Sequence, residues 1–184
     1  MWVLLVPTIL RKLPFFEAQT TLEIPGQPGI TVKHHQIILW VSIGDRQILQ
    51  LPDNAPRFPA VLDTGFNDNF LLQEQQLVSW AGMTPQALPV VDSLIVGGRH
   101  IPLRDANVWI HPNQAGFRDR FASGQPFRVE LDTGIAVWPA RLPGAPRLPL
   151  LGIRALRRAD LRVWIDCRKC QVWMSTRRGF WFFG

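Results

Sequence analysis

The sequence has little of several features that define whole classes of protein. Only two of its 184 residues are cysteine, which excludes a fold held together by several disulfides. No solenoid repeat and no low-complexity segment occurs. Sixteen prolines and fourteen glycines argue against an all-helical bundle, because both residues break helices. With 47% hydrophobic residues, the chain is expected to fold as one domain of many short elements joined by turns.

No apolar run approaches the length of a membrane span, so no membrane partner is expected. Met1–Leu10 is apolar, but Arg11 and Lys12 follow it, whereas a secretory signal carries its positive charges first. We therefore expect a cytoplasmic protein. The net charge of +6 permits nucleic-acid binding. The basic residues form only short clusters, such as that from Arg154 to Arg162, so we interpret them as a solvated face and do not expect a nucleic-acid partner.

The two cysteines, Cys167 and Cys170, form a C-x-x-C pair, which in other contexts is half of a zinc site or a redox pair. The four histidines lack the spacing that would complete a zinc site. A thioredoxin-like pair precedes a helix, whereas this pair lies between two strand-like runs. The interpretation is therefore hairpin-turn cysteines, and no metal and no cofactor are expected.

Apolar runs separated by turn residues predict about ten strands and one or two short helices. Gly97-Gly98 lies between two such runs and predicts a tight hairpin turn. Helices are expected over 73–81 and within 153–162. The fold class is therefore mainly β, with strand spacings typical of a barrel or sandwich. Strands are expected within 30–43, 46–51, 58–62, 70–72, 93–103, 106–110, 127–138 and 161–174.

The most informative stretch is Phe58–Leu72, in which an apolar run leads into Asp63-Thr64-Gly65 and a second apolar run follows. Strands disfavour aspartate, so a buried aspartate at a strand end needs a partner or an altered proton affinity. The Thr64 hydroxyl can donate and accept a hydrogen bond, and Gly65 permits close backbone approach. The same tripeptide recurs at Asp132, so by itself it is a weak signal.

Three elements in order resemble the retropepsin-like aspartic proteases, the single-lobe pepsin relatives of retroviruses and bacteria. Their pattern is an apolar strand with Asp-Thr-Gly, then a glycine hairpin called the flap, then two apolar residues and a glycine before a short helix. Here these parts are Val61–Gly65, Val96–Arg99 and Leu150–Leu156. The resemblance covers Gln36 to Met174 and implies a closed β-barrel with one or two short helices.

The resemblance implies an aspartic endopeptidase, a hydrolase, with Asp63 as its catalytic residue. One aspartate is half of such a site, so Asp63 would meet Asp63 of a second copy in a homodimer. The pair would activate the water that hydrolyses a peptide or protein substrate. Thr64 would brace the partner loop and Gly65 would contact the substrate backbone. Gly97 and Gly98 would form the tip of the flap.

The second tripeptide, Asp132-Thr133-Gly134, is open to two interpretations. Two-lobed pepsins carry one tripeptide per lobe, but this chain is too short for two lobes. The stretch between Gly134 and Gly152 is also too short to hold a flap. Asp132 is therefore interpreted as a strand-end or turn residue. The alternative is an intramolecular pair of Asp63 and Asp132.

The expected organisation has three parts: N-terminal strands or an extension at 1–35, a retropepsin-like domain at 36–176, and an aromatic tail at 177–184. The tail either forms a dimer strand or partner anchor, or packs against its own core. Two alternative functions remain open. One is a non-catalytic member of the same fold that binds a peptide or protein, and the other is a basic nucleic-acid-binding β-barrel.

Overall fold

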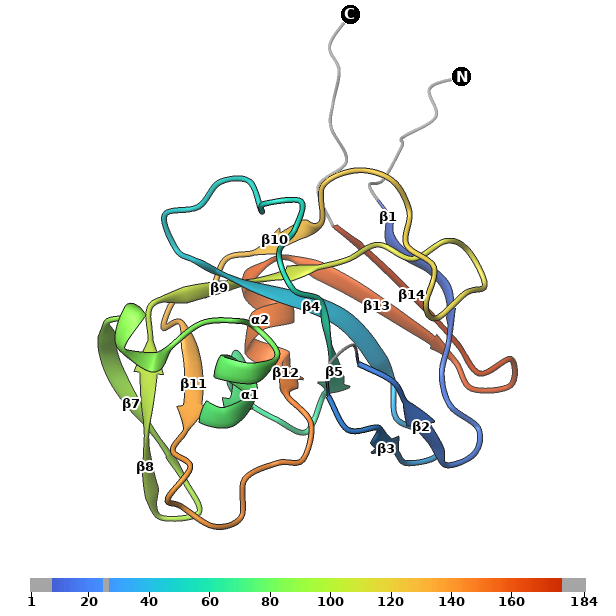
Figure 1. Cartoon of the computed structure of the whole chain (residues 1–184). Coiled ribbons are helices and arrows are strands. Elements are labelled where there is room, and N and C mark those ends of the chain that lie inside the picture. Colours follow the sequence, from blue (N-terminus) through green and yellow to red (C-terminus); the bar gives the residue numbers. More distant parts are fainter. Residues whose placement is uncertain (1–7, 25–26, 177–184) are drawn as a thin grey trace, which may run out of the picture.

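The structure is a computed structural model that describes residues 8–24 and 27–176. The expected aromatic tail at 177–184 lies outside the described residues. The described chain is mainly β, as expected, with two short α-helices and one 3-10 helix (Figure 1). Among the described residues, no helix has the length and apolar content that crossing a membrane requires.

The helices lie where the chain leaves β6 and β12 and after α1. They are α1 (Glu74–Ser79), η1 (Pro85–Ala87) and α2 (Ile153–Arg158). The strands are β1 (Thr8–Pro14), β2 (Thr20–Leu22), β3 (Ile30–Val32), β4 (Ile38–Asp45), β5 (Phe58–Asp63), β6 (Phe70–Gln73), β7 (Val90–Val96), β8 (Arg99–Arg104), β9 (Ala106–Ile110), β10 (Phe127–Val129), β11 (Ile135–Trp138), β12 (Leu150–Gly152), β13 (Leu161–Asp166) and β14 (Gln171–Thr176).

The largest sheet has nine strands in the order β10-β9-β4-β5-β12-β6-β11-β8-β7. Within the described chain, β10 pairs only with β9 and β7 only with β8, so the two ends of the sheet do not meet. The expected closed barrel is therefore wrong. Closure requires continuous pairing between the first and last strands. Here β10 has only three residues, and no residue of β7 is fully buried.

A second sheet joins the two ends of the described chain. β1 pairs antiparallel with β14, with Thr8 opposite Ser175, and β14 pairs with β13. Ile9, Leu10 and Leu13 of β1 are buried in the main hydrophobic core, together with residues of the nine-stranded sheet and both α-helices. The first strand of the 1–35 region therefore shares its core with the 36–176 region.

The run at 127–138 forms two strands, β10 and β11, because the chain bends between them. Gly134 in this bend has a φ of +72°, a conformation that favours glycine. Its backbone lies so close to the Arg104 carbonyl that an added Cβ would overlap the carbonyl oxygen. The bend therefore places β11 between β6 and β8 in the sheet.

The expected strand within 46–51 is absent from the structure. The Asp45 carboxylate accepts a hydrogen bond from Gln47 N at 2.8 Å, and the Asp45 carbonyl accepts one from Ile48 N at 3.1 Å. These two bonds turn the chain directly after β4, because a side-chain acceptor competes with strand pairing for the backbone donors.

A buried polar pair joins the interior of β4 to the residue directly after β9. Ser42 is fully buried, and His111 is 6% exposed. The Ser42 hydroxyl donates to the Pro56 carbonyl at 2.6 Å, so it accepts from His111 Nε2 at 2.8 Å. Burial, and then the charge of Arg57, lower the pKa of His111 from 6.5 to about 4. The imidazole is therefore neutral in the folded protein at neutral pH.

We expect His111 to make the fold less stable in mild acid. The unfolded chain binds a proton at His111 near pH 6.5, whereas the folded chain does so near pH 4. The free energy of unfolding therefore falls as the pH drops through this window, by about 2–3 kcal/mol near pH 4.5. His111→Gln, whose amide still reaches Ser42, should remove this part of the pH dependence.

Urea unfolding at several pH values measures this effect. His100→Gln is the matched control, because His100 is exposed, and it should leave the pH dependence unchanged. If His111→Gln lost stability in acid as steeply as the unmodified chain, His111 would not be the group responsible.

Candidate active site

Asp63 is the last residue of β5, in the middle of the nine-stranded sheet. Residues Phe58–Leu62 before it are all buried, whereas Asp63 is half-buried, and Thr64 and Gly65 are exposed. The apolar strand therefore carries one carboxylate from the core to the surface. Gly65 N–H donates to Asp63 Oδ1 at 2.9 Å, which orients the carboxylate over its own turn.

β12 fixes the position of this turn from the side. It lies between β5 and β6, parallel to β5 and antiparallel to β6. Leu151 stands opposite Leu62, and Gly152 stands opposite Asp63. The two apolar residues and the glycine predicted from the sequence therefore form a short central strand beside the candidate catalytic residue.

The chain after Asp63 folds over Gly152 at close range. Gly152 N–H donates to the Asn69 carbonyl and Ile153 N–H donates to the Phe66 carbonyl, both at 2.9 Å. An added Cβ on Gly152 would lie 2.6 Å from the Phe66 oxygen and would overlap the Asp68 oxygen. Only glycine therefore fits here, and the backbone at 66–69 is held against the start of α2.

Gly97 and Gly98 form the tip of the β7–β8 hairpin. The ladder continues to the pair Val96 and Arg99, which leaves a two-residue turn. Gly97 and Gly98 have φ values of +55° and +76°, as such turns require. In Figure 1 the tip lies at the lower left, on the side of the molecule toward which β5 runs.

The hairpin rests on an apolar cluster that it shares with the loop after Asp63. Leu94 and Val96 of β7 pack against this cluster, and so does Phe66, three residues after Asp63. The shared cluster places the hairpin and the Asp63 turn in one packed unit. Its buried members are Leu71, Ile101, Leu103, Ala136 and Trp138.

Asp132 lies in the bend between β10 and β11 and is tied to α2. Its Oδ2 accepts a hydrogen bond from Arg154 Nη2 at 2.8 Å and lies 3.5 Å from Arg158 Nε. Its Oδ1 accepts from Asn69 Nδ2 at 2.9 Å and from Thr133 N at 3.0 Å. The hydrogen bond from Arg154 is the main cause that lowers the pKa of Asp132 from 3.8 to about 2.

These contacts give the two aspartates of the repeated tripeptide different surroundings. A catalytic carboxylate pair must hold one proton between its members. Asp132 is instead ionised between two guanidinium groups, which favours a structural role. Asn69 connects the loop after Asp63 to the bend that holds Asp132. Its carbonyl accepts a hydrogen bond from Gly152 N–H, and its side chain donates one to Asp132.

Asn69, Arg154 and Arg158 are site-supporting residues that the sequence analysis does not identify. The charge pattern alone predicts a solvated face for the two arginines, although their i,i+4 spacing on α2 places both on one side of a helix and could have indicated a shared anion. Asn69 offers no comparable signal, because a single asparagine near a turn is ordinary.

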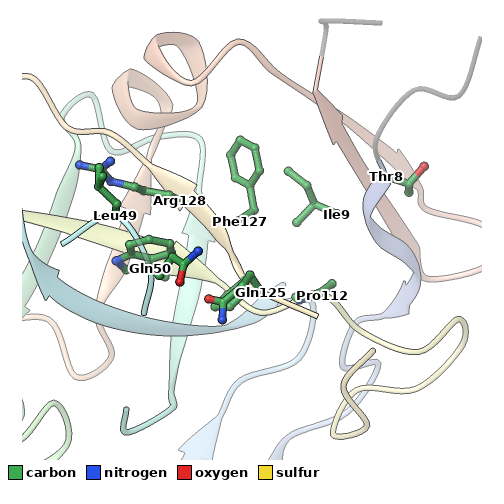
Figure 2. A pocket seen from close by; sticks show the side chains of 10 residues that line it. Thr8, Ile9, Leu49, Gln50, Pro112, Gln125, Phe127 and Arg128 are labelled. Carbon is green, nitrogen blue, oxygen red and sulfur yellow. The ribbon is translucent and has the colours of Figure 1, made fainter. Parts of the chain in front are cut away.

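A cavity of about 490 Å³ lies away from the Asp63 turn (Figure 2). Ile9 of β1 and Phe127 of β10 are among the residues that line it. Asp63 is not among the residues that line this cavity. Among the described residues, no group of three or more His, Cys, Asp or Glu side chains is placed to hold a metal ion.

We expect Gly152→Ala to destabilise the fold by about 1–3 kcal/mol, because the methyl group would overlap backbone oxygens that cannot move independently. Denaturant unfolding measures the change. Ile153→Ala, at a neighbouring side chain that is 41% exposed, is the control and should cost well under about 1 kcal/mol. Equal stabilities for the two variants would contradict the tight packing at Gly152.

We expect Asp132→Asn to cost about 1–2 kcal/mol at neutral pH, since the hydrogen-bonded guanidinium of Arg154 and the nearby guanidinium of Arg158 lose their anion. Because the folded pKa lies below the unfolded value, this contribution is complete above about pH 4 and is lost as the pH falls through about 2. Unfolding curves for the unmodified chain and the variant should therefore converge in strong acid. Asp119→Asn, at an exposed position, is the control. It should change neither the free energy of unfolding at neutral pH nor the dependence of that free energy on pH.

Comparisons with known proteins assign no function to the chain. No family model matches the chain, and searches among curated proteins and among solved structures each found no match. The position of Asp63, the packing at Gly152 and the neighbouring hairpin are therefore the basis of the function proposed below.

Proposed function

We propose that the chain is an aspartic endopeptidase that acts as a homodimer, with one Asp63 from each copy forming the catalytic pair. The observation that carries the proposal is the position of the Asp63 carboxylate at the surface end of a buried strand. Asp63 pairs in register with Gly152 of the neighbouring strand. The two elements occur in the order of the retropepsin-like pattern, with the Gly97-Gly98 hairpin between them in sequence. We also propose that the protein acts in the cytoplasm.

The chemistry follows from placing two carboxylates side by side. At about 3 Å, two carboxylates cannot both ionise at low cost, so the pair retains one proton. The ionised Asp63 takes a proton from a water molecule as that water attacks the peptide carbonyl. The protonated Asp63 of the second copy donates to the developing oxyanion, and the leaving amine then receives a proton. These steps need only the two carboxylates and water.

The surroundings of Asp63 support this use. Thr64 and Gly65 are exposed, so both are accessible to a second copy and to a substrate backbone. An extended peptide would lie as an added strand between this turn and the Gly97-Gly98 hairpin. Because that hairpin rests on the same apolar cluster as Phe66, substrate under the hairpin would be held close to Asp63.

We expect Asp63→Asn to lower peptide hydrolysis by at least about a hundredfold, since the amide cannot accept the proton from water. The assay follows cleavage of an unfolded protein by the purified full-length chain across the acid to neutral range. Thr64→Ser keeps the hydroxyl and is the matched control, which should retain most of the activity. Full activity in Asp63→Asn would refute the proposal, and peptide binding without cleavage by the unmodified chain would favour the non-catalytic alternative.

A mixing experiment separates the shared pair from an intramolecular one. Equal amounts of unmodified and Asp63→Asn chains are unfolded, combined and refolded. If each site takes one aspartate from each copy, random pairing leaves about one quarter of the activity of the unmodified protein at the same total concentration. A residual activity of about one half would assign the site to single chains and would overturn the shared pair.

A further inference from the structure

The turn between β13 and β14 holds two thiols that the proposed peptidase does not use. Asp166 and Gln171 are the last ladder pair, so Cys167 and Cys170 are the first and last residues of a four-residue turn. Both cysteines are free, with Cys167 exposed and Cys170 half-buried. Cys170 has a φ of +48°, and its Sγ lies 3.5 Å from the Cys167 carbonyl oxygen. The second thiol therefore folds back over the first cysteine.

The Asp166 carboxylate and a backbone hydrogen bond from the end of β1 also hold this turn. The Asp166 carboxylate accepts from Arg168 N at 3.1 Å and from Lys169 N at 3.0 Å. Phe15 N–H, just after β1, donates to the Cys170 carbonyl at 3.0 Å. Residues three apart in a tight turn have Cα atoms within about 7 Å, which overlaps the range of about 4.4–6.8 Å that disulfides span.

The number of ligands decides between a metal site and a disulfide. A structural zinc ion takes four protein ligands. Among the described residues, no group of three or more His, Cys, Asp or Glu side chains could hold a metal, so this turn offers only its two sulfurs. A disulfide requires no more than two sulfurs, and the arrangement therefore favours thiol oxidation.

The charges around the turn give the two thiols different roles. Arg168 and Lys169 lie between them and are exposed, so an anionic reagent is attracted to the turn. Desolvation, and then the charge of Glu17, raise the pKa of the Cys170 thiol, which keeps it protonated. Cys167 is the more accessible thiol and adjoins Arg168, so Cys167 meets the reagent first.

We propose that Cys167 and Cys170 form a reversible thiol–disulfide site that reacts with small anionic disulfides such as oxidised glutathione. The Cys167 thiolate attacks one sulfur of glutathione disulfide, whose S–S bond breaks and releases one glutathione thiolate. Cys170 then loses its proton to solvent and attacks Cys167 Sγ, which expels the second glutathione. The protein loses two protons and two electrons, and the disulfide reagent is reduced to two thiols.

The disulfide would close the turn that joins β13 to β14. Because the Cys170 carbonyl accepts a hydrogen bond from Phe15 N–H, oxidation would also restrain the end of β1. Closing a short loop lowers the entropy of the unfolded chain, so the oxidised protein should melt a few degrees above the reduced protein. The site would thus couple the redox state to the stability of the sheet β1-β14-β13.

The test uses the reduced full-length chain in glutathione buffers of defined ratio, quenched with iodoacetamide and weighed by intact mass spectrometry. In reduced buffer we expect a species with two alkylated thiols. In oxidised buffer we expect it to be replaced by a species with no alkylated thiol, whose mass is two hydrogen atoms below that of the reduced, unalkylated chain. Cys170→Ser should stop at a mixed disulfide of Cys167 with glutathione. Cys167→Ser should form its adduct several-fold more slowly than Cys170→Ser, because Cys170 is less accessible and protonated.

Three results would overturn the proposal: two alkylated thiols that persist in oxidised buffer, a disulfide-linked dimer in place of the internal disulfide, or protection of both thiols by added zinc. The charge argument has its own control. Replacing Arg168 and Lys169 by glutamine should slow oxidation by glutathione roughly three- to tenfold at low salt and should not slow oxidation by the neutral hydroxyethyl disulfide. None of these readouts depends on peptidase activity, so the two proposals succeed or fail separately.

Discussion

The close approach of Gly152 to the backbone at 66–69 is the constraint on which the candidate site depends. β12 lies between β5 and β6, so a single strand fixes both the start and the end of the Asp63 loop. A side chain at 152 would push the carbonyls of Phe66 and Asp68 away and would release the turn. The absent Cβ therefore lets the chain pack closely at the turn that carries the Asp63 carboxylate.

The two copies of the Asp-Thr-Gly tripeptide have the same residues but different surroundings, which favour different roles. Asp132 has two arginines and Asn69 around it, and such a carboxylate holds its charge and acts as a structural anchor. Asp63 has one backbone donor from its own turn and an exposed threonine and glycine beside it. A group with so few fixed partners remains available to a second carboxylate and to water.

Local patterns predicted the local structure well. The strand at 106–110 and the glycine turn at 97–98 lie where expected, and α1 lies within 73–81, because periodicity and turn residues act over a few positions. Non-local pairing was not predictable in the same way. Neither the pairing of β1 with β14 nor the open ends of the large sheet has a short-range signal, and the ion pair of Asp132 with Arg154 joins residues that are 22 positions apart. The placement of Asp63 at a strand end followed from sequence, whereas its supporting contacts did not.

The pairing of the first strand with the last has a consequence for biosynthesis. The buried residues Leu10 and Leu13 of β1 pair with Met174 and Val172 of β14. At about 5–20 residues per second, a ribosome takes roughly 8–35 s to make the chain between them. During that interval the apolar side of β1 has no native partner strand, so its apolar side chains remain open to association with other nascent chains until β14 is made.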